Sequence, residues 1–376
     1  MDRIYLDYTA DTPVDERVLS VYTETARTYF ANPNSVHSFG NGAKQIIDDS
    51  LVKMAKLLHI SSEELILTSG ASESNNLAVK GIAISSRRRG KHIISTFLEH
   101  SSVSGALTFL QEQGWEIDLV NIQPDGTIDL AHLRSLLRQD TILCAVCAVD
   151  SELGVVQPVQ EIAEILQEYP NCRLHIDTTQ AVGKVPLDLS GVHTASFAPH
   201  KFYGLKGCGV LYKAKGVVIE PLIHGGASTT IYRSGTPDAP SAASCARALE
   251  LALNEYATRL AKVTERNHQL RAALSKISSI RINSPEHAVP HILNLSVSGI
   301  KGEEMRRQLN EHGIAVSVKS ACSVPNTPSR AVMAITHDRK NALCSWRISL
   351  SHLTTEQELE HFLTVLHQII SEVNHA

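Results

Sequence analysis

Short apolar segments alternate with amphipathic segments along the first two thirds of the chain. The apolar segments read as strands that are buried on both faces, and the intervening segments have helical spacing. This alternation predicts an α/β protein whose mostly parallel, seven-stranded sheet carries helices on both faces. The predicted strands are 65–68, 92–96, 116–120, 142–149, 173–176, 194–198 and 208–212. The predicted helices between the earlier strands are 72–86, 102–113, 129–138 and 157–168.

The pattern changes near residue 240. Residues 241–277 contain neither proline nor glycine and repeat apolar positions at helical spacing, which predicts one long helix or two abutting helices. Further apolar runs and helical segments follow, which predicts a smaller α+β C-terminal domain. We therefore expect a large domain over 14–256 and a small domain formed by 1–13 and 257–376. The later predicted strands are 291–297, 314–318 and 346–350, and the helices are near 302–311, 328–335 and 355–372.

Composition narrows the class of protein. The chain has 376 residues and a formal net charge of −4, which gives no reason to expect direct nucleic-acid binding. No apolar run approaches the ~18 residues that span a bilayer, and the acidic N-terminus is unlike a signal peptide. Seven scattered cysteines argue against a disulfide framework. We expect a cytoplasmic protein that does not bind membranes.

One cysteine pair has the spacing of a metal or redox motif. Cys144 and Cys147 lie in a predicted buried strand, where positions i and i+3 point to opposite faces. Two thiols on opposite faces cannot bind one ion. We interpret both as core residues, and no metal site is predicted.

Polar side chains follow the predicted strands at their carboxyl ends, where open parallel sheets bind ligands. A helix start with small residues could hold an anion, and a lysine at the end of a buried strand loses solvation, which lowers its pKa and exposes a nucleophilic amine. An acid, an imidazole and an amide complete the set. Together they suit pyridoxal phosphate, with Lys201 as its Schiff-base lysine and Asp177 as the partner of its ring nitrogen. The residues are 69–76 with Ser72, His100, 150–152, Asp177, Gln180, His200 and Lys201.

Eight segments resemble, in the same order, those of cysteine desulfurases. These enzymes belong to the class V aminotransferase group of fold-type I pyridoxal phosphate enzymes, and the chain is most similar to the long-loop branch that supplies sulfur for iron–sulfur clusters and tRNA thiolation. The resemblance covers nearly the whole chain. The segments are YLDYTADTPVD (5–15), LTSGASESNN (67–76), EH (99–100), HIDTTQAVGK (175–184), SFAPHKFYGLKG (196–207), YRSGT (232–236), SVKSACS (317–323) and WRISLSHLTTEQE (346–358).

The resemblance implies roles for the cofactor site. Lys201 would carry the cofactor and move protons, and His100 would stack on its ring and act as acid and base. Asp177 would pair with the ring nitrogen, and Gln180 would hydrogen-bond the phenolic oxygen. The residues that would hold the phosphate are Gly70, Ala71, Ser72 and His200, with Thr236 reaching the phosphate of the neighbouring subunit of a homodimer.

It also implies how the substrate L-cysteine would react. Arg347 would bind its carboxylate through a bidentate pair. Cys322, in a polar loop with two prolines, would attack the substrate sulfur, keep it as a persulfide and pass it to an acceptor protein, either an iron–sulfur scaffold or a tRNA-thiolation enzyme. Lys319 could lower the pKa of this thiol.

Several positions depart from the family pattern. Ser151 stands where an asparagine usually helps to bind the substrate carboxylate, and Ala198 replaces a serine that usually contacts the phosphate. Lys319 stands where glycine is common, and Ser351-His352 where Gly-Arg often follows. Alternatives therefore stay open: a divergent relative with another amino-acid substrate, such as a selenocysteine lyase-like enzyme, or a scaffold with reduced catalysis.

Overall fold

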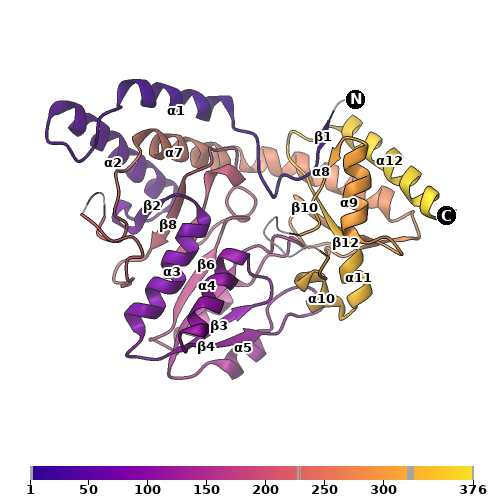
Figure 1. Cartoon of the computed structure of the whole chain (residues 1–376), viewed down its shortest axis with the longest axis horizontal. Helices are drawn as coiled ribbons and strands as arrows, with labels where there is room; N and C mark the ends of the chain where they lie inside the picture. The colour runs from indigo at the N-terminus through magenta and orange to yellow at the C-terminus, as the bar shows by residue number, and fades with distance from the viewer. Residues whose placement is uncertain (1–2, 227, 229, 320–325, 375–376) are drawn as a thin grey trace.

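The structure is a computed structural model that describes residues 3–226, 228, 230–319 and 326–374. In Figure 1 the large sheet and the helices that cover it form the left part of the molecule. A smaller group of strands and helices, mostly from the C-terminal part of the chain, forms the right part. The long helices α7 (Ala239–Asn254) and α8 (Tyr256–Leu274) follow one another directly, so the segment predicted as one or two helices forms two. Within the described residues, no helix has the length and apolar character needed to cross a bilayer.

The large sheet has seven strands in the order β2-β8-β7-β6-β5-β3-β4. β8 runs opposite to the other six strands of this sheet, so the predicted mostly parallel, seven-stranded sheet is confirmed. Because β3, β5, β6 and β7 are parallel, the loops that follow them emerge at one edge. The strands are β2 (Leu65–Thr68), β3 (His92–Thr96), β4 (Glu116–Val120), β5 (Thr141–Cys147), β6 (Arg173–Asp177), β7 (Thr194–Phe197) and β8 (Gly209–Lys213).

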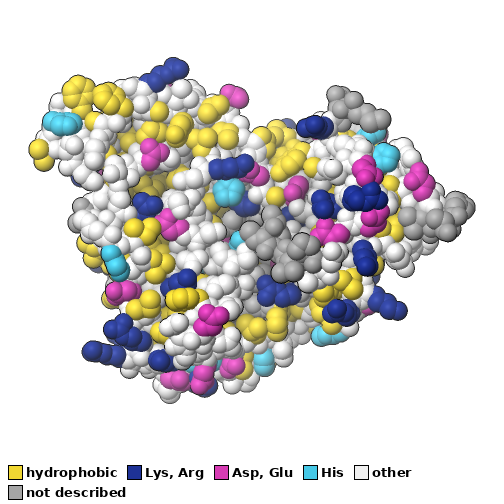
Figure 2. Space-filling view, in the orientation of Figure 1, with side chains coloured by type: hydrophobic (Ala, Val, Ile, Leu, Met, Phe, Trp, Pro, Cys, Tyr) yellow, Lys and Arg dark blue, Asp and Glu magenta, His cyan; other side chains and the backbone are white. Residues whose placement is uncertain are grey.

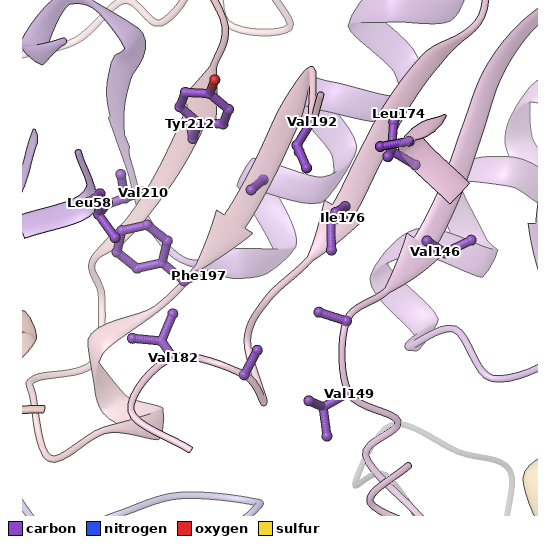
Figure 3. Packing of buried hydrophobic residues seen from close by; sticks show 14 of the residues in the cluster. Leu58, Val146, Val149, Leu174, Ile176, Val182, Val192, Phe197, Val210 and Tyr212 are labelled. Atoms are coloured by element: carbon purple, nitrogen blue, oxygen red, sulfur yellow. The ribbon is translucent and has the colours of Figure 1, made fainter. Parts of the chain in front are cut away.

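Helices cover both faces of this sheet, as predicted. One face packs on α3 (Ala71–Ser86) and α4 (Ser101–Glu112) through a buried cluster that includes Leu77, Ile82 and Leu110. The other face buries the cluster shown in Figure 3, in which Phe197 of β7 packs near Val210 and Leu58. The helices on that face are α1 (Glu16–Thr28), α2 (Ser38–Leu58), α5 (Leu130–Leu136), α6 (Val159–Leu166) and α7.

The C-terminal part forms a second core around a three-stranded antiparallel sheet of order β12-β10-β9. The indole of Trp346 packs against Phe362 in its centre, with ring centroids 6.2 Å apart. This is the predicted α+β arrangement. Its elements are α8, β9 (Ile280–Ile282), β10 (Ile292–Val297), α9 (Gly302–Glu311), β11 (Ile314–Ala315), α10 (Arg330–Thr336), α11 (Arg339–Cys344), β12 (Ser345–Ser349) and α12 (Glu356–Asn374).

The N-terminal segment joins the two parts. Strand β1 (Ile4–Tyr5) pairs with β11 of the C-terminal part, and Leu6 donates its backbone N–H to Ala315. The chain then crosses to the large sheet, where Thr12 donates its backbone N–H to the carbonyl of His200. This crossing brings the backbone of residues 9–12 to the edge at which the parallel strands end.

Three sequence-based assignments need correction. The predicted strand 314–318 forms only the two-residue β11, because its partner β1 is also two residues long, and a bridge between Ser317 and Arg347 follows. Strand 142–149 ends at Cys147, where the chain turns into the loop before Asp150. Helices α1, α2 and α11 were not predicted, although α2 has a regular apolar face.

Gly209 allows β8 to approach the start of α3 closely. A Cβ at this position would lie 2.5 Å from the Cα of Gly70, a backbone atom that has no room to move aside without displacing the helix start. We expect Gly209→Ala to destabilise the fold by about 1–3 kcal/mol and to weaken cofactor binding. Denaturant unfolding and cofactor titration would measure both effects.

The matched control is Gly105→Ala in α4, where an added Cβ meets nothing within 4 Å. Because alanine is the better helix former, this change should be neutral or stabilise the protein by up to about 1 kcal/mol. Equal effects of the two substitutions would contradict the steric argument.

Candidate active site

One cavity, of about 380 Å³, collects most of the residues that the sequence singles out. It lies beyond the carboxyl ends of β5, β6 and β7, between the large sheet and β12. The predicted residues that line it are Gly70, Ala71, Ser72, His100, Ser151, Asp177, Gln180, His200, Lys201 and Arg347.

A wider groove, of about 1020 Å³, lies at the opposite end of the sheet, around the start of β6, and contains none of these residues. Its polar groups serve the fold: His193 Nδ1 accepts from the backbone N–H of Leu174, and Arg173 donates to the carbonyl of Pro170. We therefore assign the candidate site to the smaller cavity.

Lys201 lies in the short turn that follows β7. Its Nζ donates to the carbonyls of Thr9 and Ala10 at 2.9 and 2.6 Å, and it has no ion pair with a carboxylate among the described residues. Burial, reinforced by the positive charge of Arg347, lowers the pKa of Lys201 to about 8. Since carbonyls stabilise the ammonium less than a carboxylate would, the amine becomes a neutral nucleophile close to physiological pH.

Asp177 is the last residue of β6 and is buried. Its Oδ2 accepts from Asn75 Nδ2 at 2.8 Å, and its Oδ1 accepts from the backbone N–H of Thr179 at 2.9 Å. Asn75 is held in turn by His175 Nε2 at 3.0 Å from its Oδ1. The carboxylate is thus fixed in one orientation at the cavity floor, with remaining lone pairs for a protonated ring nitrogen.

His100 caps the start of α4. Its Nδ1 accepts from the backbone N–H of Ser102 at 3.1 Å, so the proton of the neutral ring lies on Nε2. Burial, followed by the positive charge of Lys201, lowers the pKa of His100. A neutral imidazole on the cavity wall can therefore stack on an aromatic ring and exchange a proton through Nε2.

The start of α3 has the features of an anion-binding site. Gly70 gives this helix no side-chain cap, so its first N–H groups remain available at the cavity, beside Ala71 and Ser72. Burial lowers the pKa of His200 to about 4, so this side chain is neutral there. Ala198 is fully buried and is not among the residues that line the cavity.

Thr236 is not brought into this cavity. It lines a neighbouring cavity of about 180 Å³ together with Ser69 and Arg233. Arg233 forms an ion pair with Glu73, at 3.0 Å between Nε and Oε1, which fixes the segment beside the start of α3.

Arg347, on β12, is almost completely buried and holds the cavity from the C-terminal side. Its Nη1 donates to the carbonyl of Ser151 at 2.7 Å, and its Nη2 pairs with Asp7 Oδ1 at 3.1 Å. Its Nε has no hydrogen-bond partner among the described residues. The guanidinium is therefore pre-oriented and keeps donor capacity for a carboxylate.

Cys322, the predicted nucleophile, lies outside the described residues. Lys319, which we expected near it, donates from Nζ to the carbonyl and hydroxyl oxygens of Thr327 at 2.8 and 2.7 Å. This contact joins the chain on the two sides of 320–325.

Several groups at the site were missed by sequence reasoning. The carbonyls of Thr9 and Ala10 belong to the backbone, so no residue type in the sequence marks them. Nothing in the sequence around Asp7 indicates that it pairs with Arg347. Asn75 could have been found, because it lies at a helical position inside the segment 67–76. Cys147 is buried as predicted, yet it also lines the cavity.

Comparisons with known proteins agree with this geometry. Residues 4–362 match the family described as aminotransferase class-V. The protein named "Cysteine desulfurase IscS" of Dictyoglomus turgidum is 36% identical over 98% of this chain and 95% of its own length. A solved structure named "NIFS-LIKE PROTEIN" has a TM-score of 0.92 at 34% identity, covering 98% of this chain and 100% of the other. Another, titled "SspA in complex with cysteine", has a TM-score of 0.80 at 29% identity, covering 94% of this chain and 100% of the other.

The chain belongs to the aminotransferase class-V family. Within that family it is similar over its full length to cysteine desulfurases. Pyridoxal phosphate is the cofactor that the family implies, and the residues present fit it. The cavity offers a lysine with a lowered pKa, a fixed carboxylate, a neutral imidazole and a helix start for the phosphate.

The pKa of Lys201 predicts how the protein without cofactor takes it up. Because the neutral amine is the nucleophile, its reaction with pyridoxal phosphate should speed up about tenfold between pH 7 and 9 and then level off. Trapping with borohydride and mass analysis of the Lys201 peptide would measure the rate, with Lys201→Ala as the unlabelled control. A rate that keeps rising past pH 10, as for an exposed lysine, would contradict the lowered pKa.

Proposed function

We propose that this protein is a cysteine desulfurase that converts L-cysteine to L-alanine and carries the released sulfur as a persulfide on Cys322. The observation that carries the proposal is the meeting of Lys201, Asp177 and Arg347 around one cavity, in a chain similar over its length to cysteine desulfurases. A structure titled "SspA in complex with cysteine" supports L-cysteine as the substrate.

Each residue would have a defined task. When bound, pyridoxal phosphate withdraws electron density from the substrate Cα. Arg347 holds the substrate carboxylate, His100 exchanges a proton through Nε2, and Lys201 moves the proton at Cα. The Cys322 thiolate takes the substrate sulfur: an S–S bond forms, the C–S bond breaks with its electron pair on carbon, and a proton at that carbon completes alanine.

A homodimer is part of this proposal. The segment between α1 and α2 exposes Phe30 and Val36, and the first turn of α2 exposes Phe39, with 75%, 95% and 64% of their surface accessible. Apolar side chains gather over these helices in Figure 2. Since exposed apolar patches mark contact surfaces, we assign this one to a second copy of the chain, in which Thr236 would reach the partner's phosphate.

The product would pass to an acceptor protein, either an iron–sulfur scaffold or a tRNA-thiolation enzyme, in the cytoplasm. The absence of disulfides among the described cysteines is compatible with a reducing compartment. We also propose the division into a large domain (14–256) and a small domain (1–13 with 257–376). Two hydrophobic clusters support it: one lies in the large domain except for Val289 and Ile292, and the other lies entirely in the small domain.

The direct test is incubation of the cofactor-loaded protein with L-cysteine. We expect alanine, and a gain of about 32 Da, one sulfur atom, on the Cys322 peptide. Cys322→Ala should abolish both. A variant that still turns over L-cysteine would instead indicate a lyase that releases its leaving group without a persulfide, and a protein that makes no alanine would contradict the proposal.

Ser151 lines the cavity beside Arg347, and its replacement tests the substrate-carboxylate site. Ser151→Asn adds reach and a second donor, so it should lower the KM for L-cysteine about fivefold, since one hydrogen bond contributes roughly 1 kcal/mol. Ser151→Asp is the control of matched size: it removes the donor and adds a negative charge, and should raise KM. An unchanged KM in both variants would show that Ser151 does not face the carboxylate.

A further inference from the structure

A second buried lysine lies directly behind the cofactor site. Lys184 is only 8% exposed and has no ion pair with a carboxylate among the described residues. Its Nζ donates to Oε1 of Gln180, one turn earlier in the same loop. Nothing in the proposed reaction uses this amine, although burying an amine without an acid is costly.

Two contacts together decide how the amide of Gln180 is oriented. The ammonium of Lys184 has only donors, and the carbonyl of Thr9 can only accept, so the amide oxygen faces Lys184. Nε2 of Gln180 then points the other way and donates to the carbonyl of Thr9 at 3.0 Å. That carbonyl also accepts from Nζ of Lys201 at 2.9 Å, so one chain of hydrogen bonds links the two lysines.

The amide nitrogen of Gln180 has two hydrogens, and Thr9 takes one of them. Gln180 also lines the cofactor cavity, so the second hydrogen remains for a ligand there. The proposed partner is the phenolic oxygen of pyridoxal phosphate. An amide turned by 180° would present Oε1 to that oxygen, and two acceptors would face each other.

We propose that Lys184 is a positioning residue that holds the Gln180 amide with its N–H groups toward Thr9 and the cofactor. The inference rests on the proposed cofactor-binding role of Gln180. It goes beyond the proposed function because Lys184 itself touches neither cofactor nor substrate.

Within the described part of the chain, the small cavity beside Lys184 offers no carboxylate as a second partner for its amine. Burial, then the positive charges of Lys201 and Arg347, lower the pKa of Lys184 to about 7, and the amine remains a donor in both protonation states. A cavity of about 20 Å³ beside it has no carboxylate among its lining residues. The charged or titratable groups that line this cavity with Lys184 are Tyr8, Lys201, Tyr203, Arg259, His291 and His352.

The test uses the visible absorption band of the bound cofactor, titrated with pH. The Gln180 donor stabilises the deprotonated phenolic oxygen, so Lys184→Met should raise the midpoint of this titration by about one pH unit, a tenfold change in proton affinity. Lys184→Arg keeps a donor and has the 20 Å³ cavity for its extra length, so it should restore most of the shift.

Two comparisons separate positioning from other roles. Lys213 is also buried, 6% exposed, and donates to the carbonyl of Val217 far from the site. Lys213→Met should lower the melting temperature without moving the midpoint; the same behaviour in Lys184→Met would overturn the inference. In a Gln180→Leu background, Lys184→Met should add no further shift, because coupled residues are not additive. A full additional shift would show that Lys184 acts through its charge alone.

The outcome is independent of the desulfurase reaction. If the wild-type protein makes no alanine from L-cysteine but the midpoint moves as expected, the proposed function fails and the role of Lys184 stands. A wild-type protein that binds no pyridoxal phosphate would overturn the cofactor site and this inference together.

Discussion

The buried amine of Lys201 donates to two backbone carbonyls, and the rest of the site depends on the path of the chain segment that contains them. The carbonyls belong to Thr9 and Ala10, in the segment that crosses from the C-terminal part to the large sheet. Thr12 ties the same segment to the turn after Lys201, where its hydroxyl accepts from the backbone N–H of Tyr203. Tyr203 has a φ of 69°, a left-handed conformation that costs roughly 1–2 kcal/mol in a residue with a Cβ. Lys201 meets carbonyl dipoles and has no ion pair with a carboxylate among the described residues, which keeps its neutral form accessible.

Much of the fold and of the site could be predicted from the sequence, for a physical reason. Strands buried on both faces are continuously apolar, so the polar residue that ends each strand stands out, as His100, Asp177 and Lys201 do. Parallel strands bring those ends to one edge, and the cavity collects them there. Contacts made by backbone groups are not marked by any residue type in the sequence. The carbonyl of Thr9, 192 residues from Lys201, looks like any other peptide group until the chain is folded.

Contacts between side chains of two elements that are distant in the sequence could also not be predicted. Asn75 on α3 reaches Asp177 on β6 across 102 residues, and only the packing of that helix on the sheet brings them together. Asp7 is a similar case, since its pairing with Arg347 requires the N-terminal segment to lie beside β12. The short extent of β11 has a similar origin, because it follows from pairing with the two-residue β1 of the N-terminal segment.

Two groups of hydrogen-bond donors at the cavity suit anionic ligands. Lys184, Lys201 and Arg347 lie close enough that the positive charge of Arg347 lowers the pKa of both lysines. Asp7 pairs with Arg347 but leaves Nε without a partner, and Asp177 is turned toward Asn75 and the cavity floor. The donor groups of Arg347 and the uncapped N–H groups at the start of α3 thus face a desolvated space, where each interaction is stronger than in water. A phosphate at the start of α3 and a carboxylate at Arg347 would accept from these donors, so the binding of cofactor and substrate would stabilise the same arrangement that positions the reactive amine.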